Sequence, residues 1–333
     1  MRLSVIIVNY KSTQLLLNCL KSLYQFDNHF IEVIVVDNFS QDDVEAILHN
    51  QYPEVKFIQM GYNAGFARAN NAGIRMASGK SILLLNSDTI IIDDAVNRCL
   101  HQFEMSDYIA CGVQLLNEDG TPQISGNFAM KGGLNYLLPL PIVGDLIKLI
   151  ATFFKVKKPN VPDAKGIVEV DWINGAFLMV KKSVINKRGM LDEDFFLYAE
   201  ESEWCSRLQK EGKLCIYGDC KVYHLQGATA NEVFASSGKG YYNLFDKKGY
   251  QIMLSNFVRI RKQFGVFWFL FDWLIYFLTI PVFFLSTLVH KLIFSKKPMY
   301  RFSNNVDFIK NVMSILLLSV KIIKNKPHFY KVL

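Results

Sequence analysis

The chain has 333 residues, enough for one large domain or two ordinary ones, and 51% of its residues are hydrophobic, which excludes a mainly disordered protein. The formal net charge of +7 is concentrated from Arg259 to the end, where 12 Lys and Arg residues occur with only two Asp residues. These basic residues flank long apolar segments. They therefore favour anionic lipid over nucleic acid as a partner.

Six Cys residues are scattered without Cys-x-x-Cys spacing, and several lie in apolar sequence. We therefore expect buried free thiols and a reducing cytoplasm. The first apolar run begins at Leu3 without a basic region before it and ends at Asn9, after too few residues for a signal peptide. We expect this run to be a strand of the fold.

Short runs rich in Val, Ile and Leu alternate with helix-like segments through residues 3–113. This alternation is typical of a parallel sheet with helices on both faces. The pattern predicts strands at 3–8, 31–36, 55–59, 81–86 and 108–113, and helices near 12–25, 41–50, 64–78 and 93–105. Ligands bind such sheets beyond the carboxyl ends of the strands. The residues expected at this edge are Asn9, Tyr10, Asp37, Asn38, Asn86 and Asp88.

Residues 114–165 interrupt the alternation with Gly and Pro residues and a basic turn at 155–159. They predict a loop or lid that includes an amphipathic segment near 134–154. Regular structure is expected to resume afterwards. The predicted elements are strands at 168–172 and 176–180, a helix around 198–211, and short strands near 213–217 and 221–224.

The segment Phe264–Phe294 is long and apolar enough to enter a membrane. Basic residues flank it on both sides, Asp272 interrupts it, and Pro281 lies in its middle. These features favour in-plane or re-entrant insertion over a single span. A second segment, Val306–Ile323, predicts another interfacial helix. We therefore divide the chain into a catalytic domain at 1–250 and a membrane-associating region at 251–333.

Asp88 directly follows the apolar run that ends the fourth predicted strand. A lone Asp at this place is more often only a turn residue. Asp37 ends another strand in the same way, however, and an acidic cluster follows at 192–203. Together they favour a divalent cation held by oxygen ligands, which would neutralise a diphosphate.

The acidic cluster predicts the first turns of a helix. Glu203 and Arg207 have the spacing of an i,i+4 ion pair on a solvated face, and acidic residues suit a helix N-terminus. For Glu201 we favour a general base, because aromatic surroundings raise the pKa of a carboxyl group.

Asn63, Gly65 and Asn70 open a predicted helix whose first N–H groups can meet a donor phosphate or ribose. Helix capping by Asn63 is the alternative, and it is compatible with that role. No Gly-x-Gly-x-x-Gly follows the first strand, so a dinucleotide-binding fingerprint is excluded.

An ordered series of seven motifs resembles the family 2 inverting glycosyltransferases of GT-A fold, and among them the bacterial rhamnosyltransferases of O-antigen and capsule assembly. The motifs are VIIVNY, EVIVVDNFS, NAGFARANNAGI, LLLNSDT, VDWINGAFLMV, DEDFFLYAEESEWCSRL and KVYHLQG. The resemblance covers residues 1–230. It implies a Rossmann-like, mostly parallel sheet flanked by helices, with a nucleotide-binding half at 1–113 and an acceptor half at 166–230.

In that family, the carboxylate at the position of Asp37 contacts the donor base or ribose, and the one at Asp88 holds Mn²⁺ or Mg²⁺ on the diphosphate. Asn86 stands where a strict D-x-D motif has Asp, so one carboxylate must suffice. Glu201 corresponds to the base that deprotonates the acceptor, with Glu where many members have Asp, and Glu200 stands beside it.

Other positions match the family less specifically. His224 resembles a histidine that completes the metal site in some relatives, although a lone His is more often structural. Trp172, Asn174 and Gly175 resemble a segment that faces the sugar or acceptor, and Trp172 is equally suited to the core. Asp192 is also expected on the acceptor side.

The resemblance implies transfer of one sugar, with rhamnose from dTDP-rhamnose as the first expected donor, to a lipid-linked or polysaccharide acceptor. The expected location is the cytoplasmic face of the inner membrane, as a peripheral or monotopic protein. One alternative is a UDP-sugar transferase for galactose, glucose or N-acetylglucosamine. Another is a catalytically inactive membrane-bound scaffold. The donor base and sugar, the acceptor, the linkage and the oligomeric state stay open.

Overall fold

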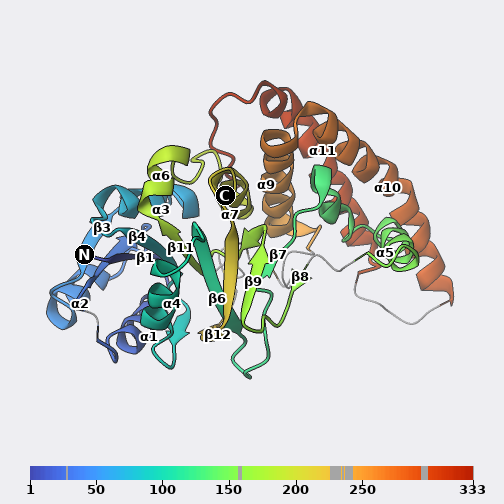
Figure 1. The fold of residues 1–333 in the computed structure, drawn as a ribbon. Helices are drawn as coiled ribbons and strands as arrows, with labels where there is room; N and C mark the ends of the chain where they lie inside the picture. Colours follow the sequence, from blue (N-terminus) through green and yellow to red (C-terminus); the bar gives the residue numbers. More distant parts are fainter. Residues whose placement is uncertain are drawn as a thin grey trace. The chain divides into compact units, whose positions relative to one another are not determined.

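The computed structural model describes residues 1–27, 29–156, 160–225, 234, 236, 243–293 and 299–332 (Figure 1). The chain forms two compact units. The first consists of residues 1–128, 160–196 and 200–229, and the second of residues 129–159, 197–199 and 230–333. Some calls from the sequence fall partly outside the described residues, among them the end of the basic turn at 155–159, the last two residues of the KVYHLQG motif, and the end of the segment Phe264–Phe294 with the basic residues Lys296 and Lys297 that flank it.

The first unit is built on a nine-stranded sheet of order β3-β2-β1-β4-β11-β6-β12-β5, in which β9 also pairs with β12. Strands β3, β2, β1 and β4 are parallel, with Asn9 opposite Asp37 and Val8 opposite Asn86. This register places the polar strand ends at one edge. The strands are β1 (Leu3–Asn9), β2 (Ile31–Asp37), β3 (Lys56–Gln59), β4 (Ser81–Asn86), β5 (Thr89–Ile91), β6 (Ala110–Leu116), β9 (Ile167–Val170), β11 (Phe177–Lys181) and β12 (Leu214–His224).

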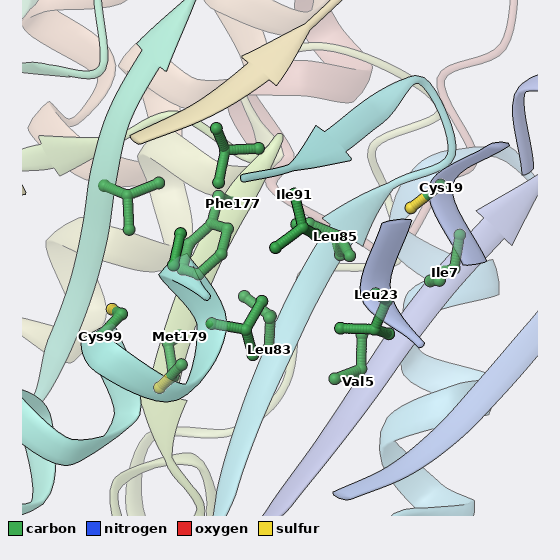
Figure 2. Close-up of a cluster of buried hydrophobic side chains, with 14 of the residues drawn as sticks. Val5, Ile7, Cys19, Leu23, Leu83, Leu85, Ile91, Cys99, Phe177 and Met179 are labelled. Carbon is green, nitrogen blue, oxygen red and sulfur yellow. The ribbon is translucent and has the colours of Figure 1, made fainter. Parts of the chain in front are cut away.

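Helices cover both faces of this sheet, as the continuous apolar runs of its strands predict. Along β1, Val5 and Ile7 point into one hydrophobic cluster, shown in Figure 2, while Ile6 belongs to the other. Helices α1 (Thr13–Leu23), α2 (Val44–Gln51) and α4 (Ala95–Glu104) pack on the first cluster. Helices α3 (Gly65–Met76), α6 (Lys182–Arg188) and α7 (Glu200–Leu208) pack on the second.

The sheet is mixed, which local alternation did not predict. Strand β11 lies between β4 and β6 and is antiparallel to both. After β6 the chain passes through a small sheet of β7 (Gly126–Asn127), β8 (Asn160–Val161) and β10 (Trp172–Ile173), and it therefore enters β11 from the opposite edge. The two strands expected near 213–224 are one strand, β12, with an irregularity between Tyr217 and Lys221.

The second unit is helical. Helices α9 (Asp246–Phe264), α10 (Val266–Ile293) and α11 (Phe302–Lys324) contact one another, and the 3₁₀ segment η1 (Lys131–Leu137) packs on α9 and α10. Helix α5 (Val143–Phe153) lies within the predicted amphipathic segment. Part of the predicted loop or lid therefore belongs with the C-terminal helices, whereas the domain boundary was expected at residue 250.

Two glycines allow η1 to approach these helices. Gly132 and Gly133 both have positive φ, and a Cβ atom at Gly132 would lie 2.1 Å from Cε3 of Trp268. At Gly133 a Cβ atom would lie 2.6 Å from Cγ1 of Ile260. Any larger residue at either position would push η1 away from α9 and α10.

Glu32 on β2 is a buried carboxylate whose replacement should weaken the fold at neutral pH. Burial by itself raises the pKa of Glu32, but hydrogen bonds from Lys56, Ser4 and Ser78 outweigh it and lower the pKa to about 2. Because this value lies below the ordinary 4.5, the group stabilises the fold above pH 4.5, and the stabilisation is lost as the pH falls toward 2. Lys56 is 47% exposed, so solvent screens part of the effect.

We expect Glu32→Gln to lower the free energy of unfolding by about 2 kcal/mol at neutral pH, and by less in acid. Urea unfolding at about pH 7 and about pH 3 measures this difference. The control is Glu104→Gln, which removes an exposed pair with Arg2 and should cost less than about 0.5 kcal/mol. A loss at Glu32 that does not change with pH would contradict the assignment.

Candidate active site

The pairing of β5 with β12 brings Asp88 and His224 together at the edge of the sheet. Strand β4 ends at Asn86, the chain turns through Ser87 and Asp88, and β5 pairs antiparallel with β12 so that Thr89 is opposite His224. The Nε2 atom of His224 lies 3.4 Å from Oδ1 of Asp88 and 3.4 Å from Nδ2 of Asn86. The structure therefore brings the predicted residues Asn86, Asp88 and His224 together at this edge.

The chemistry of this pair fits a divalent cation. Oδ1 of Asp88 is buried and has no hydrogen-bond donor among the described residues. The Nδ1 atom of His224 lies 3.0 Å from Oε1 of Gln123, which can only accept, so Nδ1 carries the proton and Nε2 presents its lone pair. A carboxylate oxygen and a neutral imidazole nitrogen are ligands that Mn²⁺ accepts.

The described residues contain no group of three or more His, Cys, Asp or Glu side chains placed to hold a metal. A cation on Asp88 and His224 would therefore take its remaining ligands from a bound diphosphate and water, as Mg²⁺ commonly does at phosphate sites.

Asp37 is fully buried at the end of β2, and hydrogen bonds hold both of its carboxylate oxygens. Oδ1 accepts from Nδ2 of Asn9 at 2.9 Å, and Oδ2 accepts from the Ser40 N–H at 2.9 Å and from Nε2 of Gln59 at 3.0 Å. Asn9 in turn accepts from Ser12 at 3.0 Å. The network fixes the carboxylate in place, and its contact with a donor base or ribose stays a prediction.

Gln59 was not among the predicted site residues. It is the last residue of β3, at the same edge as the other polar strand ends, and this position was the signal that could have identified it. Tyr10, which was predicted, is partly exposed just after β1, with the Lys11 ammonium 5.6 Å from its ring centroid.

The predicted asparagines beyond β2 join that strand to the start of α3. Asn38 accepts from the Ala64 N–H at 2.7 Å and donates to Oδ1 of Asn63 at 3.1 Å. Oδ1 of Asn63 also accepts from the Gly65 N–H at 3.2 Å. Gly65 has φ +73°, and a Cβ atom there would lie 2.3 Å from the Phe196 carbonyl oxygen, so glycine is required.

The Asn70 side chain bonds within α3, to the Phe66 carbonyl at 2.9 Å. Its neighbour Asn71, which sequence reasoning missed, bonds both backbone groups of Leu191: Nδ2 donates to the carbonyl at 2.9 Å, and Oδ1 accepts from the N–H at 3.1 Å. Asn71 therefore ties α3 to the segment that leads into the acidic helix.

Three glutamates at the start of α7 are buried. Glu203 forms the expected pair with Arg207, with Nε 2.8 Å from Oε1. Arg207 also donates to the carbonyls of Arg188 at 2.6 Å and Met190 at 2.8 Å. Glu203 is buried and Arg207 is partly buried, so the pair is structural and not part of a solvated face.

Glu200 and Glu201 place two carboxyl groups side by side in a buried position. Burial raises the pKa of Glu200 well above its ordinary 4.5, and the charge of Glu201 raises it further. Both causes favour the neutral form of Glu200, because two buried carboxyl groups so close together do not both ionise readily. Such a pair of carboxyl groups is suited to proton transfer.

The segment 174–176 links Glu201 to the Asp88 edge. The Asn86 N–H donates to the Ala176 carbonyl at 3.0 Å, and a Cβ atom at Gly175 would lie 3.7 Å from Cβ and Cγ of Glu201. Oδ1 of Asn174 accepts from the Ala176 N–H at 3.0 Å and so shapes this turn.

Two other predicted acceptor residues have mainly local contacts in the structure. The ring of Trp172 is partly buried against the second core cluster, and its buried Nε1 has no hydrogen-bond acceptor among the described residues. Oδ1 of Asp192 accepts from the Asp194 N–H at 2.9 Å. A role of either residue in acceptor binding stays a prediction.

Comparison with known proteins relates part of the chain to a known family. Residues 4–156 match the profile of glycosyl transferase family 2. This match covers slightly less than half of the chain. The matched segment contains Asp37, Asp88 and Gln123, whereas Glu201 and His224 follow it.

The chain is 29% identical over 225 residues to the low-salt glycan biosynthesis hexosyltransferase Agl10 of Haloferax volcanii. The match covers 66% of this chain and 65% of that protein. It therefore spans slightly less than two thirds of that relative's length. The chain is also 25% identical over 217 residues to rhamnosyltransferase WbbL of Escherichia coli strain K12. This match covers 62% of the chain and 77% of that protein.

The fold resembles that of mannosyltransferase PcManGT from Pyrobaculum calidifontis, solved in complex with GDP-Man and Mn²⁺. The TM-score is 0.54 at 12% identity, and the match covers 96% of this chain and 87% of that one. The prediction of a GT-A fold with a central sheet flanked by helices is therefore confirmed.

Proposed function

We propose that this chain is a metal-dependent, inverting glycosyltransferase that moves one sugar from a nucleotide donor to a lipid-linked or polysaccharide acceptor in cell-surface glycan synthesis. One observation carries the proposal: Asp88 and His224 lie together at the edge of the sheet. Segment 174–176 links this edge to Glu201. The family match supports the proposal.

Each residue has a distinct task in this proposal. Asp88 and His224 hold a divalent cation, which when bound neutralises the diphosphate leaving group. Glu201 takes the proton of the acceptor hydroxyl as that oxygen attacks the anomeric carbon from the opposite side. Glu200 is the neighbouring carboxyl group of the pair, and Asp37 contacts the donor base or ribose.

For the donor we propose rhamnose from dTDP-rhamnose, which the likeness to a rhamnosyltransferase supports. The second candidate is a hexose from a UDP-sugar, because the Haloferax relative is a hexosyltransferase. The test uses purified chain in detergent with Mn²⁺, a membrane extract and each nucleotide sugar in turn. We expect metal-dependent transfer that is fastest from dTDP-rhamnose. Transfer from a UDP-sugar alone would favour the second candidate, and nucleotide binding without turnover of any donor would favour the inactive scaffold.

We further propose that the second unit holds the enzyme on the cytoplasmic face of the inner membrane. Among the described helices, one, at Val266–Leu292, is long and apolar enough to cross a membrane, with mean hydropathy 1.9 and 28% of its most apolar window buried. One face of α10 packs within the unit, through residues such as Phe269, Tyr276 and Phe283. The other face is exposed and apolar, and includes Phe267, Leu270, Leu274, Leu278 and Leu285. This two-sided pattern supports an in-plane helix.

Not every basic residue near α10 is available to lipid. Arg261 donates to the Ile323 carbonyl at 2.9 and 3.0 Å, and Arg259 lies 5.3 Å from the ring centroid of Tyr136. The electrostatic part of membrane binding is therefore smaller than the count of basic residues indicates. Apolar insertion therefore supplies a larger share of the affinity than that count implies.

The triple variant Leu270→Gln, Leu274→Gln, Leu278→Gln should release the protein from membranes. These side chains are 46%, 47% and 53% exposed, so their replacement removes inserted apolar surface and leaves the packed face of α10 intact. After a high-salt wash we expect the unaltered chain in the membrane fraction and the variant largely in the soluble fraction. The control Met105→Gln, at an 80% exposed site of the first unit, should stay with the membrane. Unaltered chain in the soluble fraction without detergent would contradict the proposal.

A further inference from the structure

Both polar atoms of the Gln123 side-chain amide contact His224. Oε1 lies 3.0 Å from Nδ1 of His224, and Nε2 donates to the backbone carbonyl of the same residue at 2.6 Å. The side chain is buried, and the residue is 6% exposed. It belongs to the segment between β6 and β7, and 101 residues separate it from His224.

The backbone of Gln123 is itself fixed. Its N–H donates to the Leu115 carbonyl at 2.8 Å, and its carbonyl accepts from Nε2 of Gln114 at 2.9 Å and from the Ser125 hydroxyl at 3.1 Å. The amide thus reaches His224 from a rigid support, so it can impose an orientation on the imidazole ring.

We propose that Gln123 is a positioning residue that selects the imidazole tautomer of His224 and so keeps the metal site open. This inference rests on the metal-dependent function proposed above. With Gln123 in place, the proton is on Nδ1, and the unprotonated Nε2 lies 3.4 Å from both Oδ1 of Asp88 and Nδ2 of Asn86. Without that acceptor, the proton can move to Nε2 and be donated to Oδ1 of Asp88, which is 3.4 Å away. The two ligands would then satisfy each other, and a cation would have to break that bond.

The first test measures Mn²⁺ binding by the full chain in detergent, with and without dTDP. The electron paramagnetic resonance signal of free Mn²⁺ reports how much of the ion is bound. We expect Gln123→Leu to weaken Mn²⁺ binding by about 10- to 100-fold, the usual effect of losing a partner that orients a metal ligand. Gln123→Glu, which keeps an acceptor oxygen for Nδ1, should bind within about tenfold of the unaltered chain.

Ser125→Ala is the matched control. It removes two buried hydrogen bonds from the same segment, one from the Leu115 N–H and one to the Gln123 carbonyl, but leaves the amide in contact with the imidazole. We expect unchanged Mn²⁺ affinity. Equal losses in Ser125→Ala and Gln123→Leu would show general loosening of the segment and would overturn the inference, as would normal affinity in Gln123→Leu.

The second test needs no change at Gln123. In chain labelled with ¹⁵N-histidine, nuclear magnetic resonance should show metal-free His224 with the proton on Nδ1, assigned by the signal that disappears in His224→Gln. A proton on Nε2 would overturn the inference alone. Absence of Mn²⁺ binding by the unaltered chain, with or without dTDP, would instead overturn the metal-dependent function, and the inference with it.

Discussion

Asp88→Ala is expected to lower the rate of sugar transfer at least about 10³-fold and to abolish metal-dependent donor binding, because a cation on the leaving diphosphate is worth several kcal/mol. The fold should remain, since the hydrogen bond from the Leu225 N–H to residue 88 uses a backbone carbonyl that alanine also has. Transfer and Mn²⁺-dependent donor binding by the purified variant measure the effect, together with its thermal unfolding.

The control for this change is Asp107→Ala, which removes an exposed carboxylate outside the proposed metal site. It should transfer sugar at the normal rate. Near-normal turnover by Asp88→Ala at the same Mn²⁺ concentration would remove Asp88 from the metal site.

Glu201→Gln should reduce the rate by a factor of about 10² to 10⁴ while donor affinity stays within a few-fold, because the amide fills the same space but cannot accept the acceptor's proton. Single-turnover rates and donor titrations separate the two effects. A parallel fall of donor affinity and rate would make Glu201 a binding or structural residue.

Neighbouring carboxylates sharpen this test. Glu193→Gln is the control, because Glu193 is 41% exposed and pairs with Arg75, and its loss should change the rate by less than about twofold. A larger rate loss in Glu200→Gln than in Glu201→Gln would assign the base to Glu200. Asp192 would be the next candidate.

Local sequence was enough to predict most of the first half of the fold. Strands buried on both faces need uninterrupted apolar runs, and a polar residue that ends such a run must lie at the edge of the sheet. Asp37 and Asp88 were therefore identified as strand-end carboxylates without any knowledge of their neighbours. The helices from α1 to α4 followed from the segments between those runs.

The local sequence could not predict that β11 is antiparallel to its neighbours β4 and β6. Its apolar run would suit either direction, and only the path of the chain through β7, β8 and β10 decides from which edge it enters. The same holds for the start of the helical unit, because η1 is assigned to it by contacts with α9 and α10. Neither the direction of β11 nor the packing of η1 can be predicted from the local sequence.

By itself, then, the sequence determined the α/β class, the strand-end carboxylates and the apolar character of α10, because each depends on a local pattern of buried and polar positions. The tertiary structure alone decided which partner each polar group meets. His224 reaches Asp88 through the pairing of β5 with β12, Gln123 reaches His224 across 101 residues, and Asn71 reaches Leu191 across 120. An isolated Gln, Asn or His looks like any surface residue, since its role comes from a hydrogen bond that forms only when distant strands and helices pack together.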